Sequence, residues 1–253
     1  MQISSFTLAS MLALALTSLS MVDMQAAELT ILAGGGITGP MRELGPRFER
    51  ATGHKLVFVF GTTPELIKQA TSGNPFDAGV VPQEVFKDAG AQAKFVAGPT
   101  TEIARVGLGV AVRAGAAKPD IGTPEALKAA FLAAKSIGIS RGPSGVHLLN
   151  AMAKIGIADQ VKAKMVQPDL GVRVGTLVAD GKAEIGVQQI GELLPIPGIL
   201  YIGPLPGELQ TVIVYGMARS ANATQWDAAS TLVKFLTSPA VGPMLKKIGL
   251  DPA

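Results

Sequence analysis

Three short turns of small and hydroxyl residues each separate an apolar run from a helix-like stretch. The first turn covers 34–38 (GGGIT), the second 61–65 (GTTPE) and the third 140–145 (SRGPSG). A helix that begins in such a turn leaves unpaired backbone N–H groups and the positive end of its dipole facing outward, which favours anions. The turns therefore predict an anion site. Its candidate ligand-binding residues are Gly35, Gly36, Thr38, Thr62, Thr63, Arg141, Ser144 and Gly145.

The same residue types also have purely structural explanations. Thr62 and Glu65 fit a capping box, and Thr63 before Pro64 fits an N-cap. Three consecutive glycines at 34–36 are typical of a tight turn, although they also let a ligand approach the backbone closely. Helix capping and ligand binding are compatible, because one hydroxyl can serve the helix in one state and the ligand in another. Both interpretations stay open.

Charged and amide groups near the turns could complete the site. Arg141 could pair with a carboxylate through two hydrogen bonds, and His147 lies in the first turn of the following helix. A solvated arginine and a surface histidine are the simpler alternative. Gln188 and Gln189 end an apolar run and could offer amide contacts. Because neighbouring strand residues point to opposite sides, only one of these two is expected to face the ligand.

Gly34, Gly36 and Gly39 also match the GxGxxG pattern of dinucleotide-binding proteins. A dinucleotide-binding site also requires an acidic residue at the end of the next strand. The next apolar run, 55–60 (KLVFVF), ends without Asp or Glu. No organic cofactor is therefore expected.

Short apolar runs alternate with helical patterns along the chain. Runs at 28–33, 55–60 and 77–81 enclose helical patterns over 38–50 and 62–70. This order implies a largely parallel sheet covered by helices, and therefore an α/β fold. A second unit of the same kind begins near residue 105 and suggests a second lobe.

The two units predict a ligand cleft between two lobes, because open α/β sheets bind ligands at the carboxyl ends of their strands. The expected lobes are 28–107, to which 208–253 returns, and 108–207. Glycine and proline concentrate between 190 and 207, which is typical of a surface loop or hinge.

Composition limits the possible partners and ligands. The 253 residues include 22 Lys and Arg against 19 Asp and Glu, without a basic run, so no nucleic-acid partner is expected. The chain has no cysteine, which excludes disulfides and thiolate ligands. Its two histidines, His54 and His147, show no HExxH spacing, and no metal site is expected.

The N-terminus has the outline of a secretory signal peptide. Residues 6–22 are apolar and uncharged, and the small residues Ala26 and Ala27 follow. We predict a signal peptide over 1–27 and a periplasmic location. An uncleaved anchor and a helix of the folded core are the alternatives.

Several segments in order resemble one protein family. They are ILAGGGITGPM, FGTTPEL, NPFDAGVV, GVAVRAGAAKPDIGTPEALKAAFLAAKSI, SGVHLL and AEIGVQQIGELLPIPGI. Together they resemble the periplasmic solute-binding proteins of the molybdate type over essentially the whole chain after residue 27. The resemblance implies the two-lobed, type II periplasmic-binding-protein fold. It also implies a monomer that closes on a small anionic ligand and meets the membrane permease of an ABC transporter.

The residues differ from the pattern of true molybdate binders. The first turn has glycines where those proteins place a hydroxyl, and Gln188 or Gln189 takes the place of an expected tyrosine. A site that holds an oxyanion with neutral groups would not contain a charged residue such as Arg141. These differences favour an organic acid or a different oxyanion, whose charge Arg141 would neutralise.

The segments AVRAGAAKPDI and QQIGELLP resemble a branch of the same family that includes a periplasmic aconitate isomerase. This resemblance implies a second hypothesis, an isomerase of a small unsaturated polycarboxylate. His147 would then be the catalytic proton shuttle, because an unperturbed histidine titrates near pH ~6.5. Arg141 and the turn amides would hold the carboxylates. A passive binder remains the first hypothesis, and the sequence leaves open whether the chain is an enzyme.

Overall fold

The computed structural model describes residues 26–169 and 171–253. The predicted signal peptide, 1–27, lies outside these residues except for Ala26 and Ala27. Within the described part of the chain, no helix is long and apolar enough to cross a membrane.

The first part of the chain builds a parallel sheet with covering helices. Strand β1 (Glu28–Gly34) pairs in parallel with β2 (Lys55–Gly61) and with β3 (Ala78–Pro82). The helices of this part are η1 (Gly35–Ile37), α1 (Thr38–Thr52), α2 (Thr63–Thr71), α3 (Gln83–Lys87) and α4 (Ala89–Gln92).

The middle part repeats this arrangement. Strand β5 (Ile137–Ile139) pairs in parallel with β6 (Met165–Val166) and with β7 (Ile185–Gln189). The helices are α5 (Pro124–Ala133), α6 (Pro143–Lys154), α7 (Ala158–Ala163), α8 (Val174–Ala179) and α9 (Ile190–Leu193).

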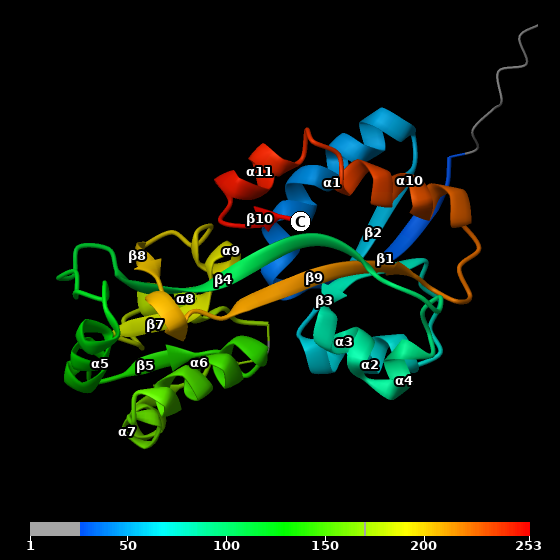
Figure 1. The fold of residues 1–253 in the computed structure, drawn as a ribbon. Helices are drawn as coiled ribbons and strands as arrows, with labels where there is room; N and C mark the ends of the chain where they lie inside the picture. The colour runs from blue at the N-terminus through cyan, green and yellow to red at the C-terminus, as the bar shows by residue number, and fades with distance from the viewer. Residues whose placement is uncertain (1–25, 170) are drawn as a thin grey trace, which may run out of the picture.

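Two antiparallel strands join the parallel sets. The first residues of β4 (Thr101–Arg113) pair with β9 (Val212–Arg219), and its last residues pair with β7 and β8 (Ile199–Pro204). Figure 1 shows β4 and β9 running between the two halves of the molecule. The chain ends with η2 (Gly207–Leu209) before β9, and α10 (Trp226–Leu236), α11 (Gly242–Lys247) and β10 (Asp251–Pro252) after it.

The sheet order is β2-β1-β3-β9-β4-β7-β5-β6. The predicted parallel pairing is therefore correct within each set, but the sheet as a whole is mixed. The reason is that β4 and β9 cross from one set to the other, and an antiparallel strand can do this without a covering helix.

Local sequence signals explain where the helices begin. Helix α5 starts after Thr123, whose hydroxyl accepts a hydrogen bond from the Ala126 N–H at 3.1 Å. Helix α1 buries Met41, Leu44 and Phe48, the apolar stripe expected from their spacing. These helices pack on the sheet and hold the ends of its strands in place.

The segment 190–207 differs from the expected surface loop. It contains α9 and β8, and α9 packs against η1, α1 and β4. Prolines and glycines at its turns suggested a loop, but tertiary contacts with the neighbouring sheet order it.

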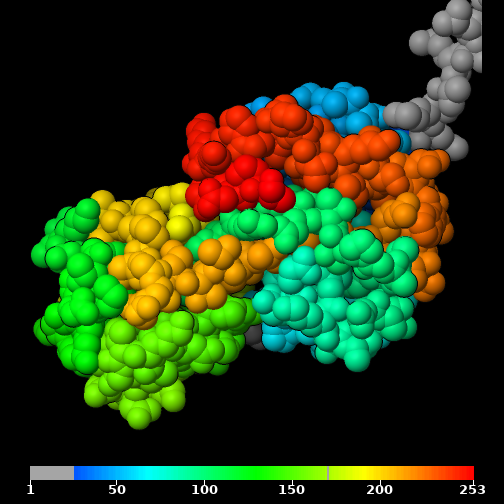
Figure 2. Space-filling view, in the orientation of Figure 1, coloured from blue at the N-terminus to red at the C-terminus, as the bar shows by residue number. Residues whose placement is uncertain are grey.

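Figure 2 shows the light-green and cyan parts of the surface meeting along an indentation at the lower edge of the molecule.

Candidate ligand-binding cleft

A cleft of about 490 Å³ lies where the two halves meet. It is lined by the three turns that the sequence singled out and by a fourth strand-to-helix junction, between β7 and α9. Of the predicted site residues, those that line it are Gly35, Thr38, Thr62, Thr63, Arg141, Ser144, Gln188 and Gln189. Gly36, Gly145 and His147 are not among its lining residues.

The first turn contributes backbone and supports the wall behind it. Gly36 is buried, and its N–H donates a hydrogen bond to the Tyr215 hydroxyl at 3.1 Å. That hydroxyl in turn donates to Oε1 of Gln189 at 2.9 Å. A Cβ on Gly36 would overlap both partners. Gly36 therefore serves close packing behind the cleft, whereas Gly35 and Thr38 line the cleft itself.

The second turn presents a free hydroxyl. Thr62 and Glu65 form the predicted capping box, in which the Glu65 carboxylate accepts from the Thr62 N–H at 2.7 Å. Thr63 is only 8% exposed, and among the described residues its Oγ1 has no hydrogen-bond partner. A buried polar atom without a partner costs free energy, so a ligand that accepts a hydrogen bond there is stabilised.

The third turn faces the second across the cleft. A Cβ on Gly142 would lie 3.9 Å from Cβ of Thr62, so the N-termini of α6 and α2 approach each other closely. The hydroxyls of Ser140 and Ser144 share a hydrogen bond of 2.6 Å. Gly145 packs against the carbonyl group of Ser140, which explains why it is a glycine although it does not line the cleft.

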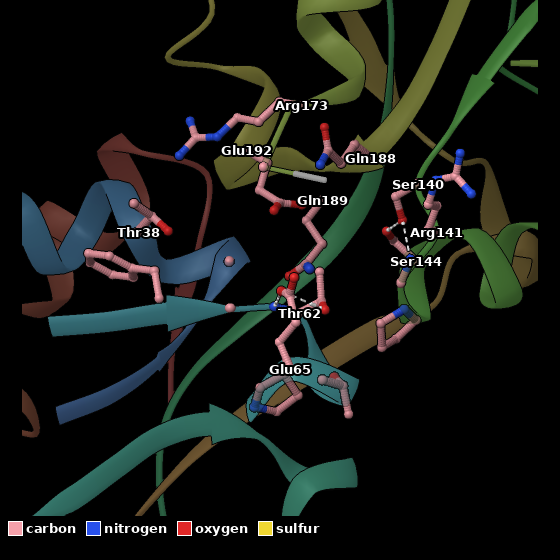
Figure 3. A pocket seen from close by; sticks show the side chains of 18 of the residues that line it. Thr38, Thr62, Glu65, Ser140, Arg141, Ser144, Arg173, Gln188, Gln189 and Glu192 are labelled. Atoms are coloured by element: carbon pink, nitrogen blue, oxygen red, sulfur yellow. Dashed lines mark hydrogen bonds between the residues drawn. The ribbon is translucent and has the colours of Figure 1, made fainter. Parts of the chain in front are cut away.

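The predicted cation of the third turn is directed elsewhere. Nε of Arg141 donates to the carbonyl oxygen of Pro168 at 2.9 Å. In Figure 3 the Arg141 guanidinium points away from Thr38 and Glu192. Arg141 lines the rim of the cleft in this state, and its pairing with a ligand stays a prediction.

The fourth junction corrects one prediction and adds a residue that the sequence analysis missed. Both Gln188 and Gln189 line the cleft, so the prediction that only one would face it was wrong. The alternation ends at this point because the strand gives way to α9 directly after Gln189. Glu192, inside the supposed loop, also lines the cleft. Its signal in the sequence was its place three residues after the end of a strand, as in the other turns.

Glu192 is a carboxyl group of the cleft whose pKa is shifted towards neutrality. Burial raises the pKa of its carboxyl group from the ordinary 4.5 to about 7, against the opposing effects of the nearby Arg173 guanidinium and a hydrogen bond from Gln188. A carboxyl group with a pKa near neutrality can both accept and return a proton at physiological pH. Figure 3 shows Arg173, Glu192 and Gln188 on one side of the cleft and Ser140 and Ser144 on another.

The other charged residues that line the cleft are three arginines and the two carboxylates Glu65 and Asp169. Besides Arg141 and Arg173, Arg42 lines the cleft, with its guanidinium 5.7 Å from the centre of the Phe60 ring. Burial also raises the pKa of Tyr215, which therefore stays protonated and keeps its hydrogen-bond role. Within the described residues, no group of three His, Cys, Asp or Glu side chains could hold a metal ion.

Comparison with known families decides the class of this protein. Residues 29–251 match the family model of the bacterial extracellular solute-binding protein. The chain belongs to this family. Its fold agrees with that assignment: the periplasmic molybdate-binding protein of Azotobacter vinelandii superposes with a TM-score of 0.73 at 19% identity, over 88% of this chain and 98% of that chain. The predicted α/β periplasmic-binding-protein fold is thereby confirmed.

Two sequence relatives of this chain are named for different functions. An aconitate isomerase from a Pseudomonas species is 34% identical over 238 residues, covering 88% of this chain and 87% of the relative. The molybdate-binding protein ModA of Azotobacter vinelandii is 28% identical over 233 residues, covering 89% and 90%. The sulfate-binding protein SubI of Mycobacterium tuberculosis shares the fold, with a TM-score of 0.72 at 16% identity over 90% of this chain and 87% of SubI.

Proposed function

We propose that this chain is the periplasmic substrate-binding protein of an ABC-type uptake system and that it binds a small organic carboxylate by closing its cleft. The lobes would be 28–107 with 208–253, and 108–207, and β4 and β9 would carry the hinge. One observation carries the proposal. The N-termini of α2 and α6 approach each other at the cleft, and the buried hydroxyl of Thr63, which lines it, has no partner among the described residues.

The size and charge of the cleft favour an organic anion over a tetrahedral oxyanion. A volume of about 490 Å³ lies within the range of sites for small organic ligands. The polar groups are also spread out: the hydroxyls of Ser140 and Ser144 lie apart from Arg173 and Glu192 (Figure 3). A ligand with carboxylates at two ends could engage both groups at once.

Titration calorimetry on the secreted form of the chain tests the proposal. The ligands to compare are citrate, tricarballylate, and cis- and trans-aconitate on one side and molybdate and sulfate on the other. Thr63→Val should weaken binding of the carboxylate by about 10- to 100-fold, the equivalent of one hydrogen bond to a charged group. Its stability should not fall, because the Oγ1 that it removes has no partner in the ligand-free protein.

Thr71→Val is the matched control, since Thr71 lies at the far end of the same helix and is exposed. The control should bind as the wild type does. Unaltered carboxylate affinity in Thr63→Val, or tight binding of molybdate and sulfate alone, would contradict the proposal.

A second candidate function is isomerisation of an aconitate-like acid. It is favoured by the 34% identity to an aconitate isomerase and by the titratable carboxyl group of Glu192 in the cleft. A base would remove a proton from the methylene group beside one carboxylate, and the same proton would return two carbons away as the double bond moves. His147 does not line the cleft, so Glu192 is the better-placed proton carrier.

Proton NMR of trans-aconitate incubated with the protein distinguishes the two functions. An isomerase converts trans- to cis-aconitate, Glu192→Gln abolishes the conversion, and His147→Gln retains it. If the wild type binds trans-aconitate and does not convert it, the result would support the uptake function and contradict the isomerase function.

A further inference from the structure

The carboxyl group of Glu192 occupies a place in the cleft where a negative charge opposes the binding of an anion. A Cβ on Gly35 would lie 2.8 Å from Glu192 Oε1, so the carboxyl group lies directly against the backbone of the first turn. Gly35 and Glu192 both line the cleft. Any ligand that reaches the amides of this turn therefore also meets the carboxyl group.

Neighbouring residues hold this carboxyl group without neutralising it fully. Oε1 of Gln188 accepts from the Val174 N–H at 3.0 Å, which leaves the amide NH₂ of Gln188 to donate to Glu192. Arg173 lies close enough to affect Glu192, but no ion pair within 4.0 Å joins them in the described part of the chain. The charge of an ionised Glu192 would thus remain available to a ligand.

The other charged and titratable groups that line the same cleft come from several elements. They are Arg42 of α1, Glu65 of α2, Arg141 before α6, Asp169 and Arg173 before α8, and Tyr215 of β9. Strand β7 and helix η1, which pack against α9, consist of uncharged residues, and β4 contributes no residue to the lining. Glu192 is therefore the one carboxyl group that faces Gly35 among these lining residues.

We propose that Glu192 is a specificity-determining residue that shares one proton with the bound ligand. The inference rests on the proposed function, because it requires that an anion enter this cleft. A hydroxyl or a protonated carboxyl group on the ligand donates to ionised Glu192. A fully ionised ligand binds only when Glu192 is itself protonated and donates. Above pH 7 the cleft therefore disfavours any anion that carries no proton, and sulfate and molybdate are examples.

The proposal predicts that binding of a fully ionised anion takes up a proton. Since the pKa of Glu192 in the free protein is about 7 and a neighbouring anion raises it further, binding at pH 8 should take up about 0.9 proton and binding at pH 6 about 0.1. Affinity should fall about tenfold for each pH unit above 7.

The experiment is titration calorimetry of the wild type with trans-aconitate and with molybdate at pH 6 and pH 8. At each pH two buffers of different ionisation enthalpy give the number of protons taken up. Glu192→Gln, which keeps a neutral donor at this place, should bind with no proton uptake and with the same affinity at both pH values. Glu208→Gln is the matched control, since Glu208 is exposed and lies outside the cleft lining, and it should behave as the wild type.

The outcomes separate this inference from the proposed function. Binding by the wild type with equal enthalpy in both buffers at pH 8 would overturn the role of Glu192 and leave the uptake function intact. Failure of the wild type at pH 6 to bind trans-aconitate or any of the other carboxylates compared above would overturn the proposed function and this inference with it. The wild-type measurement decides the matter even where Glu192→Gln does not fold.

Discussion

The stability of the ligand-free protein should depend on pH through Glu192. Its pKa in the folded protein is about 7, above the ordinary value of 4.5. Between pH 4.5 and pH 7, the Glu192 carboxyl group is therefore mostly protonated in the folded state and mostly ionised in the unfolded chain. Stability from the neutral carboxyl group is fully present below pH 4.5 and is lost as the pH rises through about 7.

The magnitude follows from the difference between the two pKa values. At about 1.4 kcal/mol per pKa unit, ionised Glu192 lowers the free energy of unfolding above pH 7 by about 3 kcal/mol. This is an upper value, because Glu192 is half-buried and the cleft admits water. Glu192→Gln cannot ionise at this place and should not show the loss.

Urea denaturation of the wild type and of Glu192→Gln at pH 4.5, 5.5, 6.5 and 8 measures this effect. Other groups titrate in both proteins, so the difference between their free energies of unfolding isolates Glu192. This difference should shift by up to about 3 kcal/mol in favour of Glu192→Gln between pH 4.5 and pH 8. Two curves that stay parallel across this range would refute the reasoning.

Three further predictions concern packing, capping and processing. Gly36→Ala should lower the free energy of unfolding by about 2 kcal/mol in urea denaturation, because a methyl group there overlaps the Tyr215 hydroxyl; an unchanged midpoint would contradict this. Thr123→Ala should cost about 1 kcal/mol through loss of the N-cap of α5, with ligand affinity unchanged in calorimetry. Ala27 is buried and its N–H donates to Nδ1 of His54 at 3.2 Å, so a processed chain that begins at Glu28 should unfold at a lower urea concentration than one that begins at Ala26.

Local patterns were sufficient to predict the strands and helices at the start of the fold, from β1 to β3. The apolar runs became strands and the periodic stretches became helices, because period-2 and period-3.6 patterns bury one face each. The capping box of Thr62 and Glu65 placed the start of α2. The three turns could be recognised in the sequence because the unpaired N–H groups at a helix start depend only on the local backbone. Four of their residues line the cleft: Thr38, Thr62, Thr63 and Ser144.

Residues whose role depends on long-range packing were beyond such patterns. Tyr215 lies 179 residues from Gly36 along the chain, yet its hydroxyl joins Gly36 to Gln189. Gly36 and Gly145 were expected to touch the ligand, but they are small because backbone and side chains press against them from elsewhere in the fold. The segment that carries Glu192 looked like a loop until its packing against η1 and β4 ordered it.

The sequence by itself therefore determined the class of the protein: an α/β chain of the solute-binding family, with three helix starts that line one cleft. Only the tertiary structure decided which groups share the cleft and how they are charged. The physical reason is that dipoles at helix starts are a property of the local backbone. Burial, which raises the pKa of Glu192, is a property of everything that surrounds it.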